Sequence, residues 1–242
     1  MISKQQQKYV QSLHNKKYRT EFKQFLVEGE KGILELLNSE FEIVSIFCTE
    51  SLKNKITNFK NTIVCSNAEI NAISTLKTNS IGVAVVHQKT ETEYIATKND
   101  LTLLLDGIND PGNLGTIIRL ADWYGIKTII CSKNTVEFYN PKVISATMGS
   151  FCRINIIYKE LKEVLIDKNI KSYGAFLDGE NIHQIDIEKP AYLIIGSESH
   201  GISPEIEGLV NHKITIPKFG LAESLNAAVA TGIILDNFFK MK

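Results

Sequence analysis

The sequence lacks the features that mark a membrane or secreted protein. No apolar run approaches the roughly 18 residues of a membrane-spanning helix, so we expect no transmembrane segment and no membrane partner. Residues 1–20 are polar and lack the apolar core of a secretory signal. The sequence is therefore expected to encode a cytoplasmic globular protein.

Cysteine is scarce and shows no functional spacing. Cys48, Cys65, Cys131 and Cys152 form no C-x-x-C pair and no metal-ligand pattern. Free cysteines of this kind are usually small apolar core residues in a reducing compartment. The histidines are dispersed along the chain as well, so we expect no metal site.

Net charge of one sign is also absent, because 27 basic residues balance 27 acidic ones. The sum therefore does not indicate a nucleic-acid partner. Residues 1–31 are locally basic, with seven basic side chains against three acidic ones. Such a stripe suits phosphate contacts, although a solvated helix face explains the charges equally well.

Residues 1–88 alternate between strand-like and helix-like segments. Candidate strands lie at 25–29, 43–49, 62–66 and 81–86, and apolar residues recur at helical spacing within 30–39 and 68–77. This alternation predicts a small α/β domain over residues 1–88. Residues 89–100 are polar and are predicted to be a linker.

Residues 101–242 alternate more regularly. Candidate strands lie at 101–105, 128–131, 153–157, 172–177, 191–196 and 213–217, and helices are expected to begin near Leu114, Pro141, Leu161, Ser203 and Ser224. Apolar strands in this order predict a mostly parallel sheet covered on both faces. Ligands of such sheets bind beyond the carboxyl ends of the strands.

The first loop at such an end is "DGINDPGNLGTIIRLADWYG", residues 106–125. Its glycines fit neither the dinucleotide fingerprint nor the P-loop. Asn113 is expected to cap the helix that follows, which local backbone demands explain without any function. They do not explain Arg119, one of only three arginines in the chain, whose planar fork suits oxyanion recognition.

Two later loops have a similar character. "YLIIGSESHGIS", residues 192–203, places Glu198 between two glycines at a strand end, although a plain glycine turn explains it equally well. In residues 214–239, Ser224 is expected to cap a helix whose first turn contains Asn226. An ordinary helix with a core stripe of Leu225, Val229 and Ile233 would explain that segment by itself.

Taken together and in this order, the segments "NDPGNLGTIIRLADWYG", "LIIGSESHGIS" and "ITIPKFGLAESLNAAVATGIIL" resemble the three signature motifs of the SpoU/TrmH-type RNA ribose methyltransferases, of the SPOUT class. The resemblance covers residues 101–242 and implies a catalytic domain with a deep trefoil knot. Residues 1–88, with "KYRTEFKQFLVEGEKGILELL", resemble the family's ribosomal-protein-like RNA-binding module.

The resemblance also implies roles for particular residues. The catalytic set would be Arg119, Asn113, Glu198, Ser224 and Asn226. S-adenosylmethionine would be the cofactor, without a metal, held by Gly196, Ile195, Ile216, Leu225, Asn226, Met148 and Gly149. In the basic stripe, the RNA-binding residues would be Lys16, Lys17 and Arg19.

The implied reaction is methyl transfer to a ribose 2′-hydroxyl. A guanidinium has a pKa above about 12, so we expect Arg119 to orient the hydroxyl and stabilise developing negative charge rather than to remove the proton. The family acts as a homodimer with the active site near the subunit interface. Ribosomal RNA is the expected substrate; a transfer-RNA methyltransferase and a non-catalytic RNA-binding assembly factor are the alternatives.

Overall fold

The computed structural model describes residues 2–56, 59–76, 81–90, 101–166 and 169–240, which form two compact units. Unit 1 comprises residues 1–90 and 137–152, and unit 2 comprises residues 91–136 and 153–242. Residues 137–152 were expected in the second domain, but they pack with the first. From residue 91 onward, the expected linker lies outside the described residues.

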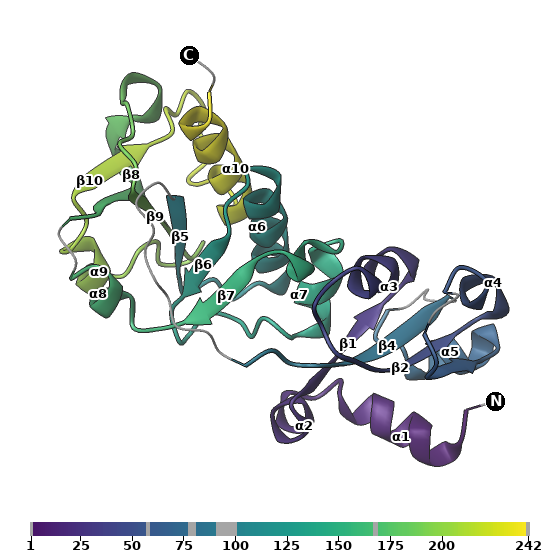
Figure 1. Ribbon diagram of the computed structural model, residues 1–242. Coiled ribbons are helices and arrows are strands. Elements are labelled where there is room, and N and C mark those ends of the chain that lie inside the picture. The colour runs from purple at the N-terminus through teal and green to yellow at the C-terminus, as the bar shows by residue number, and fades with distance from the viewer. Residues whose placement is uncertain (1, 57–58, 77–80, 91–100, 167–168, 241–242) are drawn as a thin grey trace. The chain divides into compact units, whose positions relative to one another are not determined.

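Unit 1 is built on a four-stranded sheet in the order β1-β4-β2-β3 (Figure 1). Strand β4 is antiparallel to both neighbours, and β2 and β3 are parallel. Its elements are α1 (Lys4–Ser12), α2 (Lys16–Phe22), β1 (Gln24–Glu28), α3 (Glu30–Leu37), β2 (Ile43–Cys48), α4 (Glu50–Lys53), β3 (Thr62–Val64), α5 (Asn67–Ile73), β4 (Gly82–His87), α7 (Pro141–Ala146) and η1 (Ser150–Cys152).

Aromatic packing explains why residues 137–152 belong to unit 1. The ring of Phe25, fully buried in β1, lies 4.6 Å from that of Tyr139 and 6.2 Å from that of Phe151, centroid to centroid. Phe41 also contacts Phe151, at 5.7 Å. Burying these large rings together stabilises the packing of residues 137–152 within unit 1. The alternation of strands and helices in the sequence does not predict this packing.

Unit 2 contains a six-stranded sheet in the order β10-β8-β9-β5-β6-β7, and all of its described strand pairs are parallel. Its elements are β5 (Leu101–Asp106), α6 (Pro111–Trp123), β6 (Thr128–Cys131), β7 (Asn155–Tyr158), α8 (Leu161–Val164), β8 (Lys171–Asn181), η2 (Ile182–Gln184), β9 (Ala191–Gly196), α9 (Pro204–Glu207), β10 (His212–Thr215) and α10 (Ala227–Phe238).

Helices cover both faces of this sheet (Figure 1). On one face, Leu161 of α8 and Ile206 of α9 pack in one hydrophobic cluster with Leu104 of β5 and Ile194 of β9. Helices α6 and α10 pack together on the other side, against β6 and β9. The expected α/β class and parallel sheet are confirmed.

Two helix starts differ from the prediction. Helix α6 begins at Pro111 and is capped by Asp110, whose carboxylate accepts a hydrogen bond from the Asn113 backbone N–H at 2.8 Å. Helix α10 begins at Ala227 and is capped by Asn226, not Ser224, because the Asn226 Oδ1 accepts from two backbone N–H groups. Several residues that can cap a helix lie close together in each loop, so the sequence alone predicts the wrong capping residue.

The core stripe of the ordinary-helix alternative does not form. Leu225, Val229 and Ile233 are 45%, 51% and 37% exposed. The helix instead buries Ala227, Ala228, Thr231, Ile234 and Leu235. Among the described residues, these three apolar side chains therefore stay exposed on unit 2.

Candidate active site

The loops after β5 and β9 are neighbours because these two strands are paired at the centre of the sheet. Asp106 and Gly196, their last residues, lie opposite each other in the parallel register. The first motif therefore begins beside the second at the carboxyl edge, where the binding loops of parallel sheets lie.

Three side chains from separate motifs are hydrogen-bonded in a row. Asn113, in the first turn of α6, donates from Nδ2 to the Oε1 of Glu198. The Asn226 Nδ2 donates to the Oδ1 of Asn113 at 2.9 Å. Glu198 and Asn226 lie 85 and 113 residues from Asn113 in sequence. The fold thus brings one residue from each of the three motifs to one place.

The loop that carries Glu198 has a fixed shape. Ser197 and Gly201 exchange two backbone hydrogen bonds, at 3.1 and 2.9 Å, which closes the loop on itself. A Cβ atom on Gly196 would lie 2.1 Å from the carbonyl carbon of Gly201 and 2.2 Å from the nitrogen of Ile202. Only glycine fits at this position, because the backbone of the loop passes directly over it.

Asp106 anchors the far end of that loop. Its carboxylate, in a residue only 7% exposed, accepts a hydrogen bond from the Ser203 N–H at 2.8 Å. Ser203 is the residue before α9. A similar contact holds the first loop, where the Gly107 N–H donates to the buried Ser132 Oγ at 2.9 Å. The sequence analysis did not predict these roles of Asp106 and Ser132, although an aspartate at the end of an apolar strand could have indicated a loop anchor.

Arg119 lies apart from the hydrogen-bonded row. It is exposed on α6, six residues after Asn113, which separates the two residues by about 9 Å along the helix axis. No contact among the described residues joins its guanidinium to Glu198 or Asn226. Ser224 is exposed in the loop before α10.

The residues expected to hold the cofactor fall into two groups. Gly196, Ile195, Ile216 and Leu225 all belong to unit 2. Ile195 is only 2% exposed and lies within β9, whereas Leu225 is 45% exposed.

Met148 and Gly149 belong to unit 1 and have left-handed backbones, with φ of 53° and 99°. A Cβ atom on Gly149 would lie 2.6 Å from the Cγ of Glu35. Packing against α3 therefore already requires a glycine at position 149, whatever ligand binds nearby.

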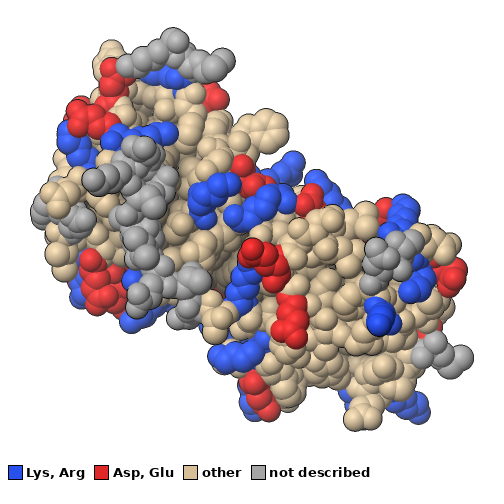
Figure 2. All heavy atoms as spheres, viewed as in Figure 1, with Lys and Arg blue, Asp and Glu red and all other residues tan. Residues whose placement is uncertain are grey.

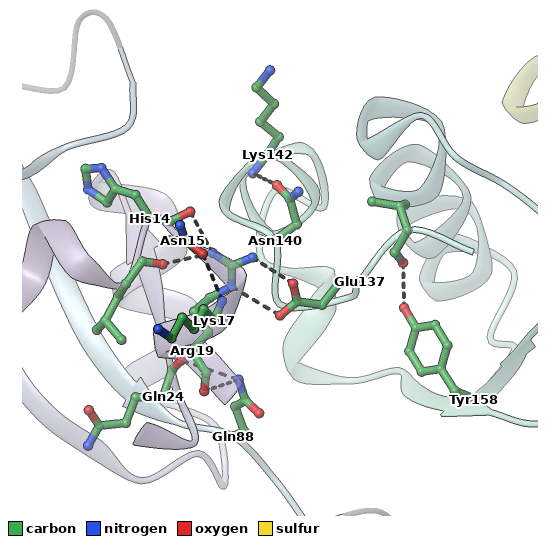
Figure 3. A network of polar contacts seen from close by, with 12 residues as sticks. His14, Asn15, Lys17, Arg19, Gln24, Gln88, Glu137, Asn140, Lys142 and Tyr158 are labelled. Carbon is green, nitrogen blue, oxygen red and sulfur yellow. Dashed lines mark hydrogen bonds and ion pairs between the residues drawn. The ribbon is translucent and has the colours of Figure 1, made fainter. Parts of the chain in front are cut away.

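The residues expected to contact RNA differ in their exposure. Lys16 and Lys17 are exposed at the start of α2. Arg19 is only 2% exposed; it donates to the carbonyl oxygens of Leu13 and His14 at 2.9 and 2.8 Å and pairs with Glu137 at 2.7 Å (Figure 3). A buried guanidinium with these partners cannot reach a phosphate, so the expectation for Arg19 is wrong.

Surface charge and metal-ligand groups give little further guidance. On the face shown in Figure 2, the described basic and acidic side chains are interspersed over both units. Among the residues that the structure describes, no group of three or more His, Cys, Asp or Glu side chains could hold a metal ion. Within those residues, no helix is both long and apolar enough to cross a membrane.

These features define a two-unit α/β protein. One unit has a parallel sheet with amide and carboxylate side chains gathered beyond its strand ends, and the smaller unit has a mixed sheet. Family models identify both parts: the SpoU rRNA Methylase family matches residues 100–236, and the MRM3-like substrate binding domain matches residues 4–84. The chain belongs to the SpoU rRNA Methylase family. The family resemblance of its three motifs is thereby confirmed.

Relatives extend over both units. The 23S rRNA (guanosine(2553)-2′-O)-methyltransferase RlmP of Bacillus subtilis is 30% identical, over 92% of this chain and 91% of its own. The structure of a TrmH-family protein from Porphyromonas gingivalis matches with a TM-score of 0.89 and 34% identity, covering 98% of each chain. An AdoMet-bound rRNA methyltransferase from Sinorhizobium meliloti matches with a TM-score of 0.87 and 27% identity, over 98% of this chain and 96% of its own.

Proposed function

We propose that this protein is an S-adenosylmethionine-dependent methyltransferase that modifies a ribose 2′-hydroxyl of ribosomal RNA. The observation that carries the proposal is the row Glu198–Asn113–Asn226, which joins the three motifs of the family in one place. The similarity to RlmP extends over the N-terminal unit as well, which favours ribosomal RNA over transfer RNA.

The residues at the strand ends fit this cofactor. The loop after β9 is closed by its own backbone bonds and excludes any side chain at position 196, so its peptide groups are held in place for a polar ligand. Ile216 and the exposed Leu225 offer apolar surface, and Asn226 offers an amide. Gly196, Ile195, Ile216, Leu225 and Asn226 would hold the cofactor, and Met148 and Gly149 are proposed to contribute from their loop. When bound, S-adenosylmethionine supplies an electrophilic methyl group.

The polar side chains then place the nucleophile. We assign to Arg119 the orientation of the 2′-hydroxyl and an adjacent phosphate, and the stabilisation of negative charge developing on the ribose oxygen. The proton of the hydroxyl leaves to solvent or phosphate, because a guanidinium stays protonated. Asn113, Glu198, Ser224 and Asn226 would fix Arg119, the ribose and the cofactor's amino-acid end.

The exposed apolar face of α10 supports a homodimer. Val229 and Ile233 are exposed one turn apart on α10, Leu225 is exposed just before the helix, and Trp123 at the end of α6 is 83% exposed. A second copy would cover such a face, and Arg119 of one subunit would then serve a site near the subunit interface. We also propose that the catalytic domain contains the trefoil knot of the family. The enzyme is proposed to be cytoplasmic.

The experiment is methyl transfer from labelled S-adenosylmethionine to separated ribosomal and transfer RNA, followed by mapping of ribose methylation. Label in ribosomal RNA at one 2′-position is expected. Label in transfer RNA alone would overturn the substrate, and blank lanes with both RNAs and with precursor ribosomal RNA would favour a non-catalytic assembly factor. Light scattering is expected to show a dimer for the wild-type protein and a monomer for Val229→Glu. A wild-type monomer that is active would overturn the shared site.

A further inference from the structure

Helices α1 and α2 expose a cluster of aromatic rings. Tyr18 and Phe22 stack with ring centroids 6.1 Å apart and planes at 21°, and Tyr9 lies 5.8 Å from Phe22. Tyr18 is 36% exposed and Phe22 is 39% exposed. Because the two residues are four positions apart, they share one face of α2. Unit 1 thus presents a pair of nearly parallel rings to solvent.

The two helices that carry these rings also expose lysines. Lys4 and Lys8 are exposed on α1, Lys16 and Lys17 at the start of α2, and Lys23 at its end. Glu21 is the acidic residue exposed between them, and no ion pair among the described residues engages these five lysines. The Lys17 Nζ lies 5.7 Å from the centroid of the Tyr18 ring, within cation–π range. The ring pair is therefore set in a positively charged surface.

A buried ion pair fixes the helix that carries the rings. Arg19, the neighbour of Tyr18, reaches inward and bridges the end of α1 to the Glu137 carboxylate (Figure 3). Asn15 caps the start of α2, and Lys23 ends it in a left-handed conformation. Since the helix is held at both ends and from behind, little conformational freedom is lost when a ligand meets the rings.

We propose that Tyr18 and Phe22 form a stacking site for an unpaired base of the RNA substrate, and that Lys16 and Lys17 contact its phosphates. This inference rests on the proposed function and identifies the surface through which unit 1 binds its RNA substrate. Every base offers a π face, and base–aromatic stacking contributes about 1–3 kcal/mol per base. A protein partner would also bury exposed rings, but the surrounding cluster of unpaired lysines matches a polyanion.

The test measures binding of the full chain to a short fluorescent oligoadenosine and to a fully paired RNA duplex. Tyr18→Leu and Phe22→Leu are expected to bind oligoadenosine about fivefold or more weakly, with the duplex unaffected. Tyr18→Phe keeps the ring and should bind as wild type. Lys17→Ala should flatten the salt dependence by about 0.7 in slope, a change that the ring variants do not produce.

Matched controls are Val64→Ala, which trims an equally exposed apolar residue of unit 1, and Lys31→Ala, which removes an exposed lysine of α3. Neither should weaken oligoadenosine binding by as much as the ring variants. A 2-aminopurine base in the strand gives a second readout that needs no ring variant, because transfer of the base from its neighbours onto the protein rings changes its fluorescence.

An unchanged 2-aminopurine signal, or ring variants that bind oligoadenosine like wild type, would overturn the stacking site even where ribosomal RNA is methylated. Weakened binding by the ring variants together with an absence of methylation would leave the site standing and overturn the catalytic proposal instead. Ring variants that keep wild-type RNA binding would favour a protein partner for the exposed rings instead.

Discussion

The Asn226 side-chain nitrogen donates to the Asn113 side-chain oxygen at 2.9 Å, across 113 residues of sequence. The same Asn226 side chain caps α10 through its oxygen. One amide therefore both starts a helix and joins the third motif to the first, and the two roles use different atoms.

Asn226→Asp separates these roles. The aspartate keeps the capping oxygen, so thermal stability should change little, whereas loss of the amide donor should lower methyl transfer by about tenfold or more. Asn226→Ala should lose the cap as well, at about 1 kcal/mol. Denaturant unfolding and initial rates measure the two effects. Equal activity of Asn226→Asp and wild type would contradict the role of the hydrogen-bonded row.

Arg119→Ala should leave cofactor affinity within a few-fold and reduce methyl transfer by about 10²-fold or more, because the residue acts on charge that develops only during the reaction. Arg119→Lys keeps the charge but not the planar fork, so it should rescue only part of the rate. Calorimetric cofactor titration and single-turnover kinetics provide the measurements. Parallel losses of cofactor binding and rate would reassign Arg119 to cofactor binding.

Gly196→Ala should force the loop after β9 to move, because its Cβ would lie 2.1 Å from Gly201. We expect a loss of about 1–3 kcal/mol in unfolding free energy and weaker cofactor binding. Gly208→Ala is the matched control, since its Cβ has only ordinary contacts at 3.7 Å and beyond. Equal stability of the two variants would show that the loop can adapt.

The Arg19–Glu137 pair should be costly to break from either side. Arg19→Ala leaves a partly buried carboxylate and Glu137→Ala leaves a buried guanidinium, so each should reduce stability by about 3–5 kcal/mol. The double variant Arg19→Ala with Glu137→Ala should lose less stability than the sum of the two single variants. Strict additivity in denaturant unfolding would mean that the two residues do not act as a pair.

Thiol chemistry should distinguish the cysteines at neutral pH. Complete burial raises the pKa of Cys131, and burial also raises the pKa values of Cys48 and Cys65, so their thiols stay protonated and shielded. Cys152 is partly exposed and should react first with a maleimide. Peptide mapping after brief labelling identifies the site, and early modification of Cys131 would indicate that unit 2 opens.

Local sequence was sufficient for most of the elements. The strands predicted at 128–131 and 191–196 match β6 and β9 residue for residue, because short apolar runs bounded by turn residues define them locally. The start of α10 was misplaced by a few residues, because Ser224 and Asn226 are both good caps and only the folded chain shows which one binds the first turn.

The amino-acid sequence by itself determined the α/β class, the order of the three motifs and the identity of Asn113, Glu198 and Asn226 as polar residues in glycine-rich loops. Tertiary structure alone decided that these three side chains are hydrogen-bonded in a row, and that Arg19 is buried against Glu137 instead of facing solvent. The physical reason is range: periodicity and capping act within a few neighbouring residues, whereas these contacts join residues at least 85 positions apart.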